Sequence, residues 1–343
     1  MLFNRPFPHP PLPMISVRDA LRKALTLELR SNPKAFLLGE EVALYEGAYK
    51  VTKGLLQEFG PSRILDTPIS EQAFTGLAVG AAMRGLRPIC EFMTWNFALQ
   101  AIDQIINSAA KTRYMSGGRI KVPVLFRGPN GAAAGVGAQH SQDFAAWYGS
   151  VPGLLVFSPW SAQDAFGAVR AAMAFSDGPS ILLENEVLYP VEHPESTLEE
   201  GEFVLPIGKL KVEAEGTDWT VVAHSKAVGD ALEAKKRLQA EHGISIRVLN
   251  LRTIRPLDIE GVIESVCKTR GRLAVVEGGW QAFGVGAEIA AAVAGDGRSF
   301  WRLEGPVVRV GGCGVPMPYA EGLEQLALPS VESIVRAIVE AQG

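Results

Sequence analysis

Short apolar segments alternate with helix-like segments along almost the whole chain, and this alternation constrains the fold more than any other feature. In the first half, the apolar segments that we expect to form strands are residues 36–39, 88–92, 122–126, 154–157 and 180–183. Helical patterns lie between some of them, at residues 97–114 and 164–175. Strands that alternate with helices indicate a parallel sheet covered by helices on both faces. We therefore predict an α/β fold with a doubly wound sheet.

The same alternation returns in the second half, which predicts a second doubly wound α/β domain. Its strands are expected at residues 220–223, 245–250, 273–276 and 307–310, and its helices at residues 228–242, 287–294 and 331–341. Residues 189–206 are rich in proline and glutamate and are expected to form a linker. Residues 1–14 are proline-rich and are expected to form a flexible arm. The predicted domains are thus residues 15–188 and 207–343.

The composition excludes several classes of function. A formal net charge of −4 gives no electrostatic reason to expect nucleic acid. No apolar run approaches the roughly 20 residues that a membrane span needs. Cys90, Cys267 and Cys313 are far apart, which predicts neither disulfides nor a zinc site and indicates a reducing compartment. A charged fraction of only 20% fits a chain that covers part of its surface with partner subunits.

Glu71 lies between a predicted strand and a helix rich in small residues. Residues 63–66 end the buried segment, and residues 76–85 continue as the helix. Ligands of open α/β sheets bind beyond the carboxyl ends of the strands, so a carboxylate there can serve a ligand. A carboxylate near a helix N-terminus can also be a simple helix-start charge. The position alone leaves both interpretations open.

The aromatic segment 92–100 follows a strand and opens a helix. Most of its residues are expected to pack in the core. Met93 and Phe97, however, are four residues apart and could form one face of a slot for a flat ring. Gln100 could then hydrogen-bond the rim of that ring.

Among the five histidines, His140 is the best candidate for acid–base chemistry. Polar neighbours flank it within a glycine-rich loop of a size that suits a ligand. His224, at the end of a predicted strand, is a weaker candidate. The other three lie in the arm, in the linker and at a helix end.

The glycine-rich segments do not predict a phosphate site. Residues 128–137 and 311–314 do not fit the G-x-G-x-x-G pattern between a strand and a helix. Gly295, Asp296 and Gly297 resemble the start of a metal–diphosphate motif, but no asparagine closes it, and a turn is the better interpretation. If the chain uses a phosphorylated cofactor, another chain must hold the phosphate end.

Several longer segments together resemble a known family. They are residues 38–42, 46–50, 66–71, 87–94, 109–112, 114–118, 127–131, 139–141, 251–256 and 276–280. On these segments the chain resembles the β-subunits of the decarboxylating component of pyruvate dehydrogenase complexes, within the transketolase-like thiamine diphosphate enzyme family. The resemblance implies an N-terminal pyrimidine-binding transketolase-like domain and a C-terminal transketolase-like domain. It also implies oxidative decarboxylation of pyruvate with reductive acetylation of lipoyl groups.

The resemblance assigns roles to individual residues. Glu71 would hydrogen-bond a pyrimidine ring nitrogen of thiamine diphosphate, whose thiazolium acts as the electron sink. His140 would act near the reactive end of the cofactor during acyl transfer. The remaining positions would contact the pyrimidine or line the entrance of the site: Met93 and Phe97, then Gln100 and Glu40.

The resemblance also implies partners and metals. An α-subunit would supply the magnesium and diphosphate end of the site, in a heterotetramer of two α and two β chains with a β–β contact. The C-terminal face would receive the dihydrolipoyl acetyltransferase core. A structural potassium ion would bind largely to backbone carbonyls near Val124, Ala172, Met173 and Asp177. The chain carries one extra residue between positions 174 and 179, which is a departure from the family at that site.

Three alternatives remain at this point. One is the β-subunit of a branched-chain 2-oxoacid or acetoin dehydrogenase, although residues 93–97 look more like the pyruvate enzymes. The second is a non-catalytic scaffold subunit that docks the acyltransferase, and the third is a self-sufficient synthase, which the absent diphosphate motif disfavours. We expect a bacterial cytoplasmic location, because no transit peptide is visible, with the mitochondrial matrix as the alternative.

Overall fold

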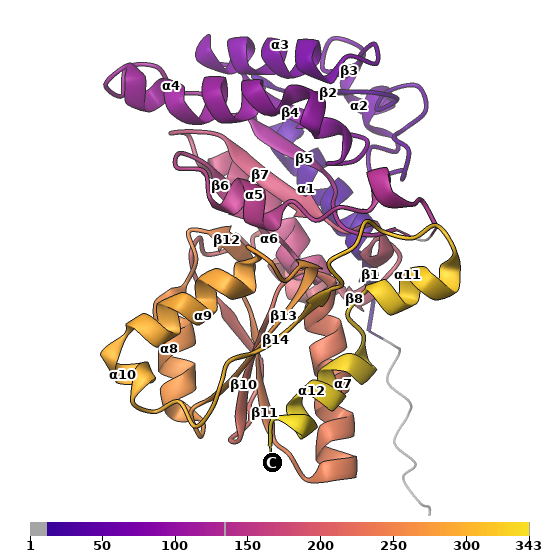
Figure 1. Cartoon of the computed structure of the whole chain (residues 1–343). Helices are drawn as coiled ribbons and strands as arrows, with labels where there is room; N and C mark the ends of the chain where they lie inside the picture. The colour runs from indigo at the N-terminus through magenta and orange to yellow at the C-terminus, as the bar shows by residue number, and fades with distance from the viewer. Residues whose placement is uncertain (1–11, 134, 343) are drawn as a thin grey trace, which may run out of the picture.

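The computed structural model describes residues 12–133 and 135–342, which form two α/β units. In Figure 1 the purple-to-pink N-terminal unit lies above the orange-to-yellow C-terminal unit. The first unit is built on a seven-stranded sheet and the second on a five-stranded sheet, and a separate two-stranded ribbon completes the strands described.

The first sheet has the strand order β12-β6-β7-β5-β4-β2-β3, and every neighbouring pair is parallel except β12 and β6. Its strands are β2 (Ala35–Gly39), β3 (Ile64–Asp66), β4 (Arg87–Glu91), β5 (Leu125–Pro129), β6 (Leu155–Phe157), β7 (Ser180–Glu184) and β12 (Thr253–Arg255). Strands β2, β5 and β7 are buried along their whole lengths, as expected for a sheet covered on both faces. The parallel register brings the last residues of β2, β4, β5 and β7 to one edge of the sheet.

Helices cover both faces of this sheet. They are α1 (Val17–Ser31), α2 (Leu55–Phe59), α3 (Glu71–Met83), α4 (Ala110–Met115), α5 (Ala145–Gly149) and α6 (Ala162–Ala174), with the short elements η1 (Phe97–Ala101), η2 (Gln104–Ala109), η3 (Ala138–His140), η4 (Glu186–Leu188) and η5 (Glu195–Gly201). α1 and α6 share one apolar core, whereas α3, η1, η2 and α4 belong to another. Ser16 caps α1, because its Oγ accepts a hydrogen bond from the backbone N–H of Asp19 at 3.1 Å.

The segment predicted as one continuous helix at residues 97–114 is a composite. It begins as the 3₁₀ turn η1, widens into the π-helix η2 and ends as α4. The apolar repeat does place Ile105 and Ala109 in the core. Such a repeat determines which face is buried, but it does not fix the hydrogen-bond spacing, so the prediction of a regular helix is corrected here.

The second sheet has the order β14-β13-β10-β11-β9, with only β9 antiparallel to its neighbour among the strands described. The strands are β9 (Lys211–Ala214), β10 (Trp219–Ala223), β11 (Ile246–Asn250), β13 (Arg272–Trp280) and β14 (Val308–Gly312), and the helices are α7 (Lys226–His242), α8 (Ile259–Lys268), α9 (Val285–Gly295), α10 (Gly297–Phe300), α11 (Glu321–Ala327) and α12 (Val331–Glu340). α7 and α12 pack on one face, and α8 and α9 on the other. The predicted α/β class with two doubly wound domains is confirmed.

The two units are joined by more than the chain between them. β12 comes from the second half of the sequence but pairs with β6 of the first sheet. β1 (Met14–Ser16) pairs antiparallel with β8 (Glu192–Pro194), which lies inside the segment predicted as a linker. Leu198 and Leu205 of that segment are buried against α6 of the first unit. Residues 1–11 of the predicted arm lie outside the described residues.

Candidate active site

Two glutamates lie together at the carboxyl edge of the first sheet. Glu40 directly follows β2, and Glu71 is the first residue of α3. Only 5% of Glu40 and 8% of Glu71 is exposed. Burial and, secondly, the charge of Glu71 raise the pKa of Glu40 to about 7. Because Oε1 of Glu40 is also buried without a hydrogen-bond partner among the described residues, this carboxyl group is free to pair with a ligand donor.

The loop after β2 is held in place from the neighbouring strand. The carboxylate of Asp66, at the end of β3, accepts hydrogen bonds from the backbone N–H groups of Ala43 at 2.7 Å and Leu44 at 3.0 Å. Glu41 and Glu46 in this loop have φ angles of 58° and 62°, in the left-handed region. Non-glycine residues in that region persist only where the surroundings hold them, and such positions cluster at functional sites.

The predicted ring-binding residues follow β4. Met93 and Phe97 are half-buried, and Gln100 is exposed. The indole of Trp95 is fully buried and donates a hydrogen bond to the backbone of β7 at 3.1 Å, which anchors the segment on the sheet. Because η1 packs against α3, Phe97 and Glu71 lie on neighbouring elements.

His140 meets Phe97 across the site. The two rings are in an edge-to-face arrangement with 5.3 Å between their centroids. Asn96 fixes the histidine loop, since its Oδ1 accepts hydrogen bonds from both the backbone N–H and the side-chain amide of Gln142 at 3.2 Å. The amide of Asn96 in turn donates to Thr94 Oγ1 at 2.8 Å. The structure thus brings together two predicted site residues that are distant in the sequence.

A buried ionic network supports the same edge of the sheet, and sequence reasoning missed it, because only the isolated motif around Arg127 points to it. Arg127 of β5 donates to Glu184 of β7 at 2.6 Å and to Glu91 of β4, across sequence separations of 57 and 36 residues. The hydroxyl of Tyr189 donates to Glu184 at 2.7 Å. Burial raises the pKa of Glu91 to about 7, although Arg127 opposes this shift. The network ties together the ends of three strands.

The carbonyl groups predicted to bind potassium have other partners. Arg87 donates hydrogen bonds to the carbonyl oxygens of Ala172, at 3.3 Å, and Met173. The carbonyl oxygen of Val124 accepts a hydrogen bond of 2.9 Å from the backbone N–H of Ser180, the first residue of β7. The carboxylate of Asp177 forms ion pairs with Arg113 and Lys121 on the surface. A guanidinium group therefore stands against two of these carbonyls, an arrangement that does not fit a potassium ion. The potassium site stays a prediction, and the hydrogen bonds from Arg87 do not support it.

Asp296 of the diphosphate-like segment serves as a helix cap. Its carboxylate accepts from the backbone N–H of Arg298 at 2.8 Å and also pairs with that guanidinium. Within the described ranges, no group of three or more His, Cys, Asp or Glu side chains is arranged to hold a metal ion. None of the helices described is long and apolar enough to cross a membrane.

Comparison with known families gives two matches that together cover most of the chain. Residues 13–192 match "Transketolase, pyrimidine binding domain", and residues 208–334 match "Transketolase, C-terminal domain". A solved structure described as "Split gene transketolase, inactive beta4 tetramer" has a TM-score of 0.75 and 27% identity, over 95% of this chain and 98% of that chain. The fold is thus that of a transketolase-type subunit.

Relatives with high sequence identity show which kind of transketolase-type subunit this chain resembles. The protein named "Pyruvate dehydrogenase E1 component subunit beta, mitochondrial" from Bos taurus is 57% identical over 94% of this chain and 89% of its own length. Its Homo sapiens counterpart is 56% identical over the same shares, and the beta-1 subunit of Arabidopsis thaliana is 58% identical over 94% of this chain and 88% of its own length. The chain belongs to the family of pyruvate dehydrogenase E1 component β-subunits, which confirms the resemblance seen in the sequence.

Proposed function

We propose that this chain is the β-subunit of a pyruvate dehydrogenase and forms one half of a thiamine diphosphate site. The reaction is the oxidative decarboxylation of pyruvate with reductive acetylation of lipoyl groups on dihydrolipoyl acetyltransferase. The observation that carries the proposal is the buried pair of Glu40 and Glu71 at the carboxyl edge of the sheet, next to the element that bears Phe97. Family membership and the names of the relatives support both the cofactor and pyruvate as substrate.

The residues fit the aminopyrimidine end of the cofactor. Oε1 of Glu40 lacks a partner within the described structure, and Phe97 offers a half-buried aromatic face. When bound, thiamine diphosphate supplies the electron sink for loss of carbon dioxide. Glu71 would hydrogen-bond a ring nitrogen of the bound cofactor, and Glu40, whose pKa is raised to about 7, would keep a proton available near neutral pH. Met93 would pack on the ring beside Phe97, and Gln100 would line the entrance.

His140 would serve the acyl-transfer half of the reaction. Its imidazole is half-buried at the edge of Phe97, where it can hold a proton next to the incoming dihydrolipoyl thiol. We predict that His140→Ala lowers reductive acetylation of lipoyl groups more than decarboxylation followed with an artificial electron acceptor. Equal losses in the two assays would contradict this role.

The proposed assembly contains two α and two β chains with a β–β contact. In it, the α-subunit holds magnesium and the diphosphate, and the C-terminal face of this chain docks the acyltransferase core. The oligomer named for the split-gene transketolase supports a multi-subunit state. The relatives are mitochondrial by name, which fits the alternative location considered above, whereas the bacterial cytoplasm stays a prediction.

The test is co-expression with an α-subunit from the same genome, followed by dye reduction with thiamine diphosphate and magnesium. Pyruvate, 2-oxoisovalerate and acetoin are compared, with and without the α-subunit. We expect turnover of pyruvate only when both chains are present. Turnover of one of the other substrates instead would identify a related dehydrogenase, and no turnover at all by the assembled complex would favour a scaffold.

Substitution of the central carboxylate tests the site itself. Glu71→Gln should lower kcat by about 10²–10⁴-fold, because positioned proton transfer contributes that much. The matched control is Glu41→Gln, an exposed glutamate in the neighbouring loop. Size-exclusion chromatography should show the same complex for both variants. Near-normal activity of Glu71→Gln would refute the assignment.

A further inference from the structure

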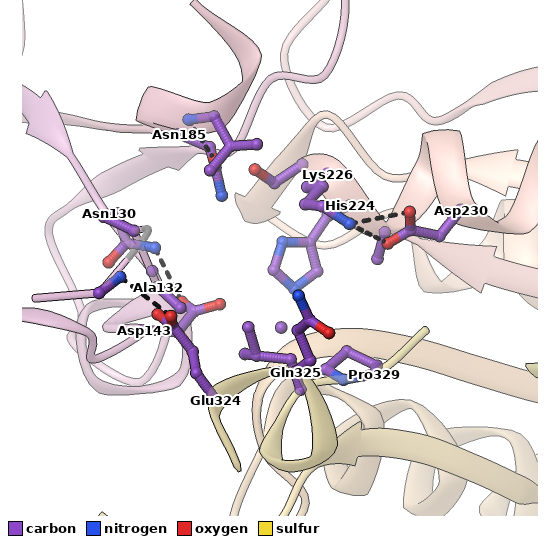
Figure 2. A pocket seen from close by; sticks show the side chains of 18 of the residues that line it. Asn130, Ala132, Asp143, Asn185, His224, Lys226, Asp230, Glu324, Gln325 and Pro329 are labelled. Carbon is purple, nitrogen blue, oxygen red and sulfur yellow. Dashed lines mark hydrogen bonds and ion pairs between the residues drawn. The ribbon is translucent and has the colours of Figure 1, made fainter. Parts of the chain in front are cut away.

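A cavity of about 430 Å³ lies between the two units (Figure 2). Its walls come from the start of the glycine-rich loop of the first unit, from residues 224–230 after β10, and from α11 with the residues that follow it. Cavities of this size hold small organic ligands. The glutamates and rings of the proposed active site do not line it.

His224 projects into this cavity from the end of β10 (Figure 2). Only 2% of the residue is exposed. A hydrogen bond of 2.9 Å joins Nδ1 to Ser158 Oγ, whereas Nε2 has no hydrogen-bond partner within the described structure. Burial lowers the pKa of His224, despite the charge of Asp143, so the imidazole is neutral at neutral pH. A buried polar atom without a partner carries a desolvation penalty that a ligand can relieve.

The same cavity faces carboxylates that have no lysine or arginine partner among the described residues. Glu324, on α11, is 6% exposed. Its Oε2 accepts a hydrogen bond of 2.9 Å from the backbone N–H of Gly135. Its Oε1 is buried and has no hydrogen-bond partner in the described part of the chain. Asp143 also lines the wall. Lys226 is the only lysine or arginine among the described residues of the lining, and it is already paired with Asp230 at 2.7 Å.

We propose that this cavity binds a small organic amine in its ammonium form. The ammonium group donates hydrogen bonds to Oε1 of Glu324 and to the carboxylate of Asp143, where burial strengthens the charge-assisted contact. A second polar group of the ligand reaches Nε2 of His224. The apolar body packs on the remaining wall, formed by Ala132, Ala133, Val187, Leu328 and Pro329. This binding site goes beyond the proposed pyruvate dehydrogenase function and does not depend on it.

The test compares two probes that differ in one group, 2-phenylethylamine and the uncharged 2-phenylethanol. Binding to the full-length chain is measured by isothermal titration calorimetry, independently of enzyme activity. We expect the amine to bind and the alcohol to bind about tenfold more weakly or not at all, because a hydrogen bond to a charged group contributes on this scale. Equal binding of the two probes, or no binding of the amine, would overturn the proposal.

Three variants locate the site. Glu324→Gln should weaken the amine about tenfold while keeping an acceptor for Gly135, and Leu328→Trp should block binding by filling the cavity without removing charge. The control is Glu340→Gln, the same substitution at an exposed position on α12. Circular dichroism shows whether each variant is folded. If both cavity variants are folded and bind the amine as the control does, the site is wrong.

Discussion

Arg127 is the cation on which the carboxyl edge of the first sheet depends. Its side chain is 1% exposed, and the two carboxylates that it contacts belong to Glu91 and Glu184, which are 7% and 2% exposed. Arg127→Met keeps a similar volume but removes the guanidinium. Within the described ranges, the side chain of Glu184 would then keep only the hydrogen bond from Tyr189, and Glu91 would lose its cation. Breaking a buried ion pair by removing one partner costs about 3–5 kcal/mol, which is the loss in the free energy of unfolding that we expect at neutral to alkaline pH.

The pH dependence of this loss has a definite sign. Burial already raises the pKa of Glu91 to about 7 in the folded protein, and loss of Arg127 removes the charge that opposes this shift. A carboxyl group with a raised pKa binds more protons in the folded than in the unfolded state, so stability falls as pH rises through that range. The destabilisation should therefore be smaller at about pH 5 than at about pH 8, because protonation removes the unpaired charge.

Urea unfolding followed by circular dichroism measures this effect. The matched control is Arg30→Met, which removes an arginine from a pair with Glu58 on the surface, where the arginine side chain is 59% exposed. Exposed pairs contribute little, so this variant should unfold almost as the parent does. If the free energies of unfolding of Arg127→Met and Arg30→Met differ by less than about 1 kcal/mol at pH 8, the buried network does not stabilise this edge of the sheet.

Two further predictions concern the site. Glu40→Gln removes a carboxyl group whose pKa is raised from 4.5 to about 7. The variant should therefore lose the fall in the free energy of unfolding that the parent shows between these pH values, roughly 1–2 kcal/mol after solvent screening, whereas Glu41→Gln should retain it. Identical pH profiles of urea unfolding for the two variants would contradict this. Asn96→Ala releases the loop of His140 and should lower lipoyl acetylation about tenfold with unchanged KM for pyruvate, since misplacement of a catalytic group slows the step that it serves. An unchanged acetylation rate in stopped-flow assays would show that Asn96 does not position the histidine.

Local sequence patterns predicted the elements that short-range forces determine. The apolar segments before Glu40 and Glu71 are strands, and Glu71 lies at a helix N-terminus as expected, although this helix runs from Glu71 to Met83 and not over residues 76–85. The alternation of strands and helices also predicted both sheets. Each of these features depends on residues within about one turn or one strand of each other, which is the range that periodicity describes.

Features that depend on convergence of distant segments could not be predicted in this way. The pKa of Glu40 is raised first by burial and second by the charge of Glu71 on a different segment, and a local sequence pattern shows neither cause. The partners of Arg127 lie 36 and 57 residues away in the sequence. A local sequence pattern does not show which carboxylates are buried next to its guanidinium group. Likewise, β12 contains a single apolar residue, Ile254, between Thr253 and Arg255, and its place beside β6 is decided by packing between the two units.

The position of β12 has a consequence for how this protein can be divided. The strand is encoded after the second unit has begun, yet it closes the edge of the first sheet at β6. A fragment that ended before the second unit would leave the backbone groups of β6 unpaired at an open edge, which is a template for aggregation. The two units are therefore not exchangeable modules: evolution or engineering that swaps the C-terminal unit must bring a strand that fits the foreign sheet.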